Sequence, residues 1–275
     1  MVRKILGGLL KNKSALVGVI ICTLIIVMAI AGPLLAKDPY RQEAKTLLRP
    51  SLSHPMGTDN LGRDVLSRLL IGARYSLMVG FFAVLLASIL GLLAGSAAGF
   101  FGGVADSVIM RLADVFLAFP YVLGAIALMV FLGPSLINVP IAIAVFTWAS
   151  FARIYRSSVL DIKGKEYVTA ARLSGAGSVR VMFGHIMPNA AAPLIVFGTT
   201  EVAYAILGES VLSFIGLGAP VQFPSWGRML ADSLNYSSTS PWLIFFPGLF
   251  LVLTVLSFIL IGDGLRDVLD PKTVD

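Results

Sequence analysis

Few residues of this chain belong to the types that carry out bond chemistry. Its only histidines are His54 and His185, and its only cysteine is Cys22. A serine hydrolase needs a histidine base within about 3 Å of its serine, and a cysteine-based metal site needs several such ligands. The chain also lacks the Gly-x-x-x-x-Gly-Lys-Ser/Thr phosphate loop that cradles ATP. We therefore expect no catalytic residue, no metal site and no cofactor bound by this chain.

The composition indicates a membrane protein. Of the 275 residues, 57% are hydrophobic and 13% are charged, and the mean hydropathy is +0.90. A soluble protein is closer to a quarter charged. The formal net charge of +6 is explained by basic loops facing the cytoplasm, so we expect a lipid bilayer and no nucleic acid as partner.

Apolar runs separated by polar segments predict an all-α polytopic membrane protein with six transmembrane helices. A spanning helix needs about 20 apolar residues, and the first run is too long for a signal-peptide core. Basic residues precede that run, so the N-terminus is expected in the cytoplasm, and six spans return the C-terminus there. The expected spans are 15–35, 76–101, 116–132, 139–158, 190–214 and 241–261.

These spans divide the chain into four parts. Residues 1–36 hold the cytoplasmic N-terminus and first span, and residues 37–73 form an external segment with an interfacial helix over 61–71. Residues 74–263 form a core of five spans, and residues 264–275 form a cytoplasmic tail. In the second span, Gly91, Gly95 and Gly99 recur every four residues, which predicts close packing against another helix.

Residues 166–189 are the long polar, basic insert of the C-terminal half. Val168–Leu173 predicts a short helix, and Gly175 and Gly177 allow a sharp turn because glycine reaches positive φ. Val179, Met182, Phe183 and Ile186 then recur at helical spacing, which predicts a second short amphipathic helix. Two short helices meeting at a glycine corner form a docking surface. The alternative is an ordinary basic cytoplasmic loop.

Two carboxylates lie inside the fifth expected span, Glu201 and Glu209. An ionisable residue within a span costs several kcal/mol unless it is paired or hydrated, so it faces a cavity or a neighbour. Both are candidates for a polar lining of a translocation path. Structural pairing is the alternative; we favour it for Glu209, and both interpretations stay open for Glu201.

The insert 166–189 resembles the "EAA loop" of ABC importer permeases, whose pattern is Glu-Ala-Ala, three residues, Gly, nine residues and Ile-x-Leu-Pro. Thr169 stands in place of the glutamate, His185 in place of the isoleucine and Met187 in place of the leucine. The resemblance implies that this loop couples the chain to an ATPase. The residues expected to do so are Thr169, Ala170, Ala171, Arg172, Gly175, Gly177, His185 and Pro188.

Three further runs resemble one branch of these permeases, the C-type subunits of dipeptide, oligopeptide and nickel importers. They are the run His-Pro-x-Gly-Thr-Asp-x-Leu-Gly-Arg-Asp from His54, the run 209–218 followed by Trp226-Gly227, and the run 262–271. The resemblance implies the type I ABC importer permease fold in the plasma membrane. It also implies half of a translocation pathway for di- or oligopeptides, with nickel or a metal chelate as the alternative substrate.

The same resemblance implies the partners. These are a second, B-type permease as heterodimer, two ATP-binding subunits that carry ATP and magnesium, and an external solute-binding protein. A membrane hydrolase is one competing class, and a channel or small structural membrane protein is the other. The expected topology separates His54 from His185 by a hydrocarbon core of about 30 Å, which disfavours the hydrolase. A channel needs no loop of the ATPase-coupling type, which disfavours that class.

The topology is testable by cysteine labelling. In a chain carrying Cys22→Ala, Ser51→Cys should react with a membrane-impermeant maleimide in intact cells, because residues 37–73 are expected outside. Ser178→Cys should react only after permeabilisation, because residues 166–189 are expected inside. The reverse labelling pattern would overturn the orientation.

Overall fold

The computed structural model describes residues 2–42, 45–220 and 222–269, and every helix or strand element in these ranges is helical. The elements are α1 (Val2–Lys11), α2 (Lys13–Leu35), α3 (Val65–Phe101), α4 (Gly103–Leu117), α5 (Tyr121–Leu132), α6 (Asn138–Lys163), α7 (Glu166–Leu173), α8 (Ser178–Val181), the π-helix η1 (Met182–Ile186), α9 (Met187–Phe214), α10 (Trp226–Ser233), the 3₁₀-helix η2 (Leu234–Tyr236) and α11 (Trp242–Leu269).

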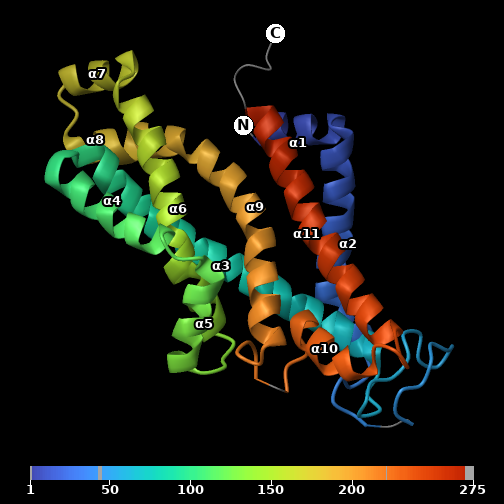
Figure 1. The fold of residues 1–275 in the computed structure, drawn as a ribbon. Coiled ribbons are helices and arrows are strands. Elements are labelled where there is room, and N and C mark those ends of the chain that lie inside the picture. Colours follow the sequence, from blue (N-terminus) through green and yellow to red (C-terminus); the bar gives the residue numbers. More distant parts are fainter. Residues whose placement is uncertain (1, 43–44, 221, 270–275) are drawn as a thin grey trace.

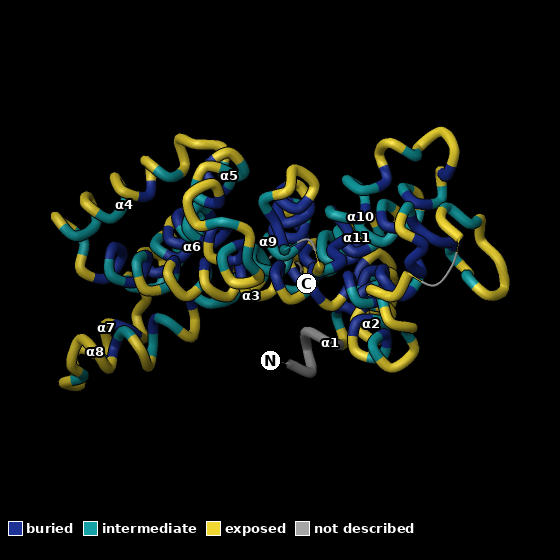
Figure 2. Tube along the Cα trace, turned by 90° about the horizontal axis from the view of Figure 1, so that it is seen from below, coloured by how far each residue is buried: buried dark blue, intermediate teal, exposed yellow. Residues whose placement is uncertain are grey.

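The long helix α3 joins two groups of helices (Figure 1). On one side α2 and α11 pack together, and on the other side α6 packs with α4 and α5, while α9 lies between the groups. Short helices α7 and α8 lie at the same end as α1, and α10 lies at the opposite end with the segment 37–64 (Figure 1). Buried residues follow the shared faces of α3, α6 and α9, whereas α4, α7 and α8 are exposed along most of their length (Figure 2).

Four helical stretches are long and apolar enough to cross a membrane: α2, α3, the stretch from α8 to the end of α9, and α11. The bent pair of α4 and α5 brings the number to five if it counts as one span. Helix α6 is the remaining expected span, and Arg153 and Arg156 interrupt its apolar second half. The expected count of six spans is therefore approximate.

The third expected span is broken. The sequence predicts a span over 116–132 that Pro120 interrupts near its start, and the structure breaks there: α4 ends at Leu117, α5 begins at Tyr121, and the two are bent by 87°. Pro120 stands at the break with φ −58° and ψ 121°. Proline removes a backbone donor and disfavours helical geometry in the residue before it, so the helix ends there.

The structure has no separate interfacial helix over 61–71, because these residues lead into the long helix α3. Helix α3 begins at Val65, and its first turns continue without a break into the membrane-spanning stretch. Its N-cap is Asp64, whose carboxylate accepts hydrogen bonds from the backbone N–H of Ser67 at 2.9 Å and from the Ser67 hydroxyl at 2.7 Å. Such an N-cap satisfies the free backbone donors of the first turn.

Ion pairs connect the residues before α3 to α3 itself and to α10. Arg63 Nε lies 2.7 Å from Asp59 Oδ2, Arg68 Nε lies 3.5 Å from the same oxygen, and Arg63 reaches Asp232 of α10 at 4.0 Å. His54 Nδ1 lies 2.9 Å from Asp64 Oδ1. This cluster of ion-paired residues is called the clasp below; its members are His54, Asp59, Arg63, Asp64, Arg68 and Asp232.

The pKa of Asp64, the N-cap of α3, is shifted from its usual value. Burial raises the pKa of Asp64, but hydrogen bonds from His54 and Ser67 outweigh burial and hold the pKa below its usual range. The folded protein therefore stabilises the ionised form of Asp64. This contribution to the free energy of unfolding is fully present above the pKa of Asp in the unfolded chain, and it is lost as the pH falls through the lower pKa of the folded state.

The glycine stripe of α3 packs against α6 as predicted. A Cβ atom at Gly95 would lie 2.5 Å from the backbone oxygen of Ala152, and one at Gly99 would lie 2.8 Å from Val159 Cγ1. Gly91 faces Phe151 in the same way. These contacts leave no room for side chains, so the two backbones approach closely along the stripe.

Gly95→Ala should destabilise the protein by about 1–3 kcal/mol, because the new methyl group overpacks the α3–α6 contact. Thermal unfolding of the purified protein in detergent measures the effect. Gly198→Ala on α9 is the matched control, since its Cβ would meet its neighbours at an ordinary 3.7 Å. Equal midpoints for the two variants would contradict the close approach of α3 and α6.

Candidate coupling surface and membrane-embedded carboxylates

Helix α7 ends in a left-handed glycine turn. Gly175 has φ +84°, its N–H donates to the Arg172 carbonyl at 3.0 Å, and the N–H of Ala176 donates to the Ala171 carbonyl at 3.1 Å. This pattern is the Schellman motif, which satisfies the last carbonyls of a helix and favours glycine at the left-handed position. The predicted corner is therefore confirmed at Gly175. It is wrong for Gly177, whose φ is −64°, a value open to other residues.

The second predicted helix forms differently. Helix α8 covers only Ser178–Val181, and the π-helix η1 continues directly into α9. A π-helix inserts one extra residue per turn and so changes which side chains face the core after it. Across α8 and η1, Val181 and Ile186 are buried, while Val179 and Phe183 are exposed. The expected single apolar face is divided between the core and the surface.

Large apolar side chains remain exposed on this insert. Leu173 is 85% exposed, Val179 70% and Phe183 54%, and Tyr167 is also exposed. An exposed apolar set on a segment outside the spans is typical of a protein-docking site. Arg172 and Arg180 add positive charge beside it.

The buried side of the insert 166–189 packs against α3, α6 and α9. Val168, Val181 and Ile186 pack in one buried cluster with Tyr155 and Val159 of α6. Around this cluster, Lys163 Nζ donates to the Phe100 carbonyl at 2.6 Å, the Tyr155 hydroxyl donates to the Met187 carbonyl at 3.0 Å, and the Arg172 guanidinium lies 5.7 Å from the centroid of the Phe100 ring. The insert is thereby in direct contact with α3, α6 and α9.

The residues predicted for coupling lie in three places: helix α7 with the glycine corner, the π-helix η1, and the first turn of α9. Those of α7 and the corner are mostly exposed, His185 in η1 is half-buried, and Pro188 in α9 is exposed. Sequence reasoning missed the apolar residues Leu173 and Tyr167, which could have been found as apolar residues off the buried face of α7. The exposed positions of α7 and the corner are Thr169, Ala170, Arg172, Gly175 and Gly177, with Ala171 half-buried.

Glu209 is completely buried within the subunit. Its carboxylate accepts hydrogen bonds from the Ser213 hydroxyl at 2.6 Å and from the Ser76 hydroxyl of α3 at 3.2 Å. The Ser210 hydroxyl lies 3.5 Å away. A buried carboxyl group surrounded by hydroxyl donors is the arrangement that offsets the cost of removing it from water. This geometry favours the structural role, in which Glu209 ties α9 to α3.

Glu201 precedes Glu209 by about two helical turns on α9 and has a different environment. It is half-buried, and within the residues that the structure describes its carboxylate has no hydrogen bond or ion pair. A carboxylate in a spanning helix without a protein partner requires water or a ligand. Glu201 therefore remains a candidate residue of the translocation path.

A cavity of about 610 Å³ opens beside this part of α9. It lies between α6, α9 and α11, and its polar lining includes Thr200, Asp263 and Arg266. Sequence reasoning missed these residues because it assigns the run 262–271 to the chain terminus rather than to the last turns of α11. Among the described residues, no group of three or more His, Cys, Asp or Glu side chains could hold a metal ion.

The helix arrangement has the fold of ABC importer permeases. A solved structure of inward-facing conformations of the MetNI methionine ABC transporter matches with a TM-score of 0.60, covering 73% of this chain and 95% of that chain at 17% identity. A second crystal form of the same transporter matches with a TM-score of 0.59. These likenesses establish the fold.

Sequence comparisons identify the family. The family model described as binding-protein-dependent transport system inner membrane component matches residues 87–275, and that of the N-terminal TM domain of oligopeptide transport permease C matches residues 2–53. The chain belongs to the family of binding-protein-dependent transport system inner membrane components. It is therefore a multi-pass inner membrane transport subunit and not an enzyme. Membership implies, in general, a partner permease, an ATPase and a substrate-binding protein.

Relatives match over nearly the whole chain. The dipeptide transport system permease protein DppC of Alkalihalophilus pseudofirmus is 46% identical, covering 98% of this chain and 90% of its own. The oligopeptide transport system permease protein OppC of Bacillus subtilis is 43% identical, covering 95% and 86%. The di/tripeptide transport system permease protein DppC of Pseudomonas aeruginosa is 44% identical, covering 95% and 89%.

The two carboxylates are distinguishable by substitution. Glu209→Ala should lower stability and membrane abundance, because buried serine hydroxyls lose their acceptor, at about 1–3 kcal/mol for each unsatisfied group. Glu201→Ala should leave abundance unchanged and reduce uptake at matched abundance. Quantitative immunoblotting and uptake in vesicles measure both. Loss of folding with Glu201→Ala but not with Glu209→Ala would reverse the two assignments.

Proposed function

We propose that this chain forms half of the translocation pathway of an ATP-driven importer for di- and oligopeptides. The observation that carries the substrate class is the near-full-length similarity, at 43–46% identity, to permeases named for dipeptides, di/tripeptides and oligopeptides. None of these three relatives is named for nickel or a metal chelate, so the similarity gives that alternative no support.

The proposed assembly contains a B-type permease as the other half of the pathway, two ATP-binding subunits and an external solute-binding protein. ATP and magnesium belong to the ATP-binding subunits, and this chain binds neither. The end of the molecule with α7, α8 and α1 faces the cytoplasm, and the end with α10 and residues 37–64 faces outward. This orientation agrees with the positions of these elements at opposite ends (Figure 1).

In the proposed mechanism, the exposed face of 166–189 sits in a groove of one ATP-binding subunit. Leu173, Val179 and Phe183 supply the apolar contacts that this docking removes from water. Closure of the ATP-binding subunits displaces α7 and α8, and the contacts of Lys163 and Tyr155 carry the displacement into α3, α6 and α9. Rigid-body rocking of these helices then alternates access to the path.

Gly175→Arg tests the docking. The side chain adds bulk and charge to the corner, and the positive φ adds strain of about 1–2 kcal/mol. Overpacking a closed contact costs about 1–3 kcal/mol more, so co-purification of the ATP-binding subunits should fall about tenfold or more. Peptide uptake should fall with it at matched membrane abundance.

Gly133→Arg in the α5–α6 turn is the matched control. Gly133 also has a positive φ, +76°, and a Cβ there meets no atom within 4 Å. It therefore reproduces the strain and the charge away from the insert, and it should retain the ATP-binding subunits. Normal retention and uptake for Gly175→Arg would leave 166–189 as an ordinary basic loop.

A further inference from the structure

A ridge of exposed side chains runs along the first half of α3. Arg74, Met78 and Phe82 are spaced four residues apart and so lie one above the other on the same face. Met78 is 48% exposed and Phe82 45%, whereas the residues of α3 that pack against α6 and α9 are buried. The ridge is therefore part of the outer surface of a membrane-spanning helix.

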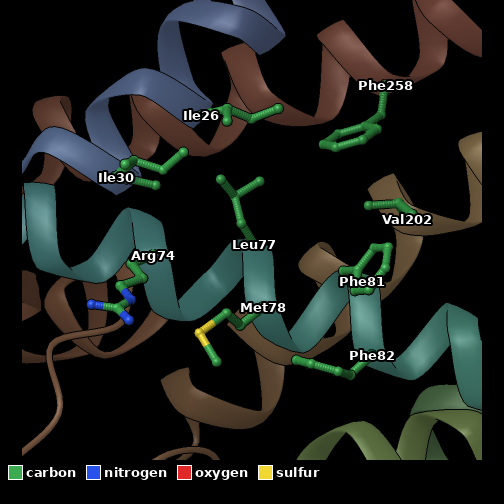
Figure 3. A pocket seen from close by; sticks show the side chains of 10 residues that line it. Ile26, Ile30, Arg74, Leu77, Met78, Phe81, Phe82, Val202 and Phe258 are labelled. Atoms are coloured by element: carbon green, nitrogen blue, oxygen red, sulfur yellow. The ribbon is translucent and has the colours of Figure 1, made fainter.

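Two apolar grooves flank this ridge and share its three residues. The first, of about 550 Å³, lies between α3, α2 and α11, where Leu77 points toward Ile26 and Ile30 with Phe258 opposite (Figure 3). The second, of about 330 Å³, lies on the side of the α5–α6 turn and the segment before α10. Its lining includes Tyr40, Tyr75, Leu136 and Phe223.

Among the described residues, Arg74 is the only charged one in the lining of either groove. Within the same part of the chain, its guanidinium has no hydrogen bond, ion pair or ring contact. An unpaired arginine on a spanning helix is costly unless an anion or water meets it. The site thus offers one cation beside two apolar grooves.

The position of Arg74 along α3 suits a membrane interface. The 37 residues of α3 extend about 55 Å, which exceeds a hydrocarbon core of about 30 Å. Arg74 lies nine residues after Val65, about 14 Å from the start of the helix. It therefore lies in the first third of α3, at the end of the molecule that carries α10, with Met78 and Phe82 further along the helix.

We propose that this surface binds an anionic phospholipid. The headgroup phosphate pairs with Arg74, and the two acyl chains lie in the two grooves on either side of Met78 and Phe82. A forked apolar ligand with a single anionic head matches two grooves that diverge from one cation. A protein helix, in contrast, has one face and would fill only one of them.

The test uses the full-length chain purified with its co-purifying subunits. The probe is phosphatidylglycerol with a photoreactive diazirine on one acyl chain, compared with phosphatidylcholine carrying the same group. Labelled peptides should map to both grooves, at or beside Leu77, Met78 and Phe82. Phosphatidylglycerol should label at least several-fold more than phosphatidylcholine, because only the former has net negative charge.

Arg74→Gln should reduce phosphatidylglycerol labelling about fivefold, the effect of removing one basic residue near an anionic membrane surface. Arg74→Lys should restore most of it. Arg111→Gln, which removes an exposed arginine on α4 outside both grooves, should leave labelling at Met78 unchanged. These readouts do not require transport, so they are independent of the proposed substrate.

Two results would overturn the proposal. Equal labelling by the two lipids, unchanged by Arg74→Gln, would make the grooves nonspecific lipid contacts. Efficient crosslinking of Phe82→Cys, in a chain carrying Cys22→Ala, to a second permease would show that a protein covers the ridge instead.

Discussion

The close approach of α3 and α6 is the constraint on which the rest of the structure depends. Because Gly91, Gly95 and Gly99 present no side chains, the backbones of the two helices meet along the second half of each helix. Ion pairs from α6 to α4, Arg156 to Asp106 and Arg153 to Asp114, build outward from this contact. The rigid pair α3–α6 then provides the base from which the docking insert projects.

Helix α3 connects the two ends of the molecule physically. At one end its N-cap carboxylate and Arg68 belong to the clasp, which connects the residues before α3 to α10. At the other end the carbonyl of Phe100 accepts a hydrogen bond from Lys163, next to the insert. A single uninterrupted helix therefore spans the distance between the clasp and the proposed ATPase-binding surface, and it cannot bend locally without breaking hydrogen bonds.

Charged residues inside the helix bundle fall into two kinds, those with hydrogen-bond or ion-pair partners in the chain and those without. Glu209 is surrounded by serine hydroxyls from α3 and α9 and has no access to solvent. Glu201, in contrast, is half-buried and has no hydrogen bond or ion pair in the described part of the chain. Arginines show the same contrast, since Arg68 pairs with the Asp59 carboxylate and Arg74 has no such partner among the described residues. Groups left without a partner are those available to a ligand.

Sequence alone determined the features that depend on local sterics and hydropathy: most of the spans, the glycine stripe and the left-handed corner at Gly175. It did not determine contacts between distant segments: Ser76, which donates to the Glu209 carboxylate, lies 133 residues before it in the chain. Helical periodicity also failed after Gly177, where Phe183 of the π-helix η1 is exposed and Ile186 is buried. Only tertiary packing decided which apolar residues of the insert enter the core and which remain exposed for a partner, since hydropathy does not distinguish the two sets.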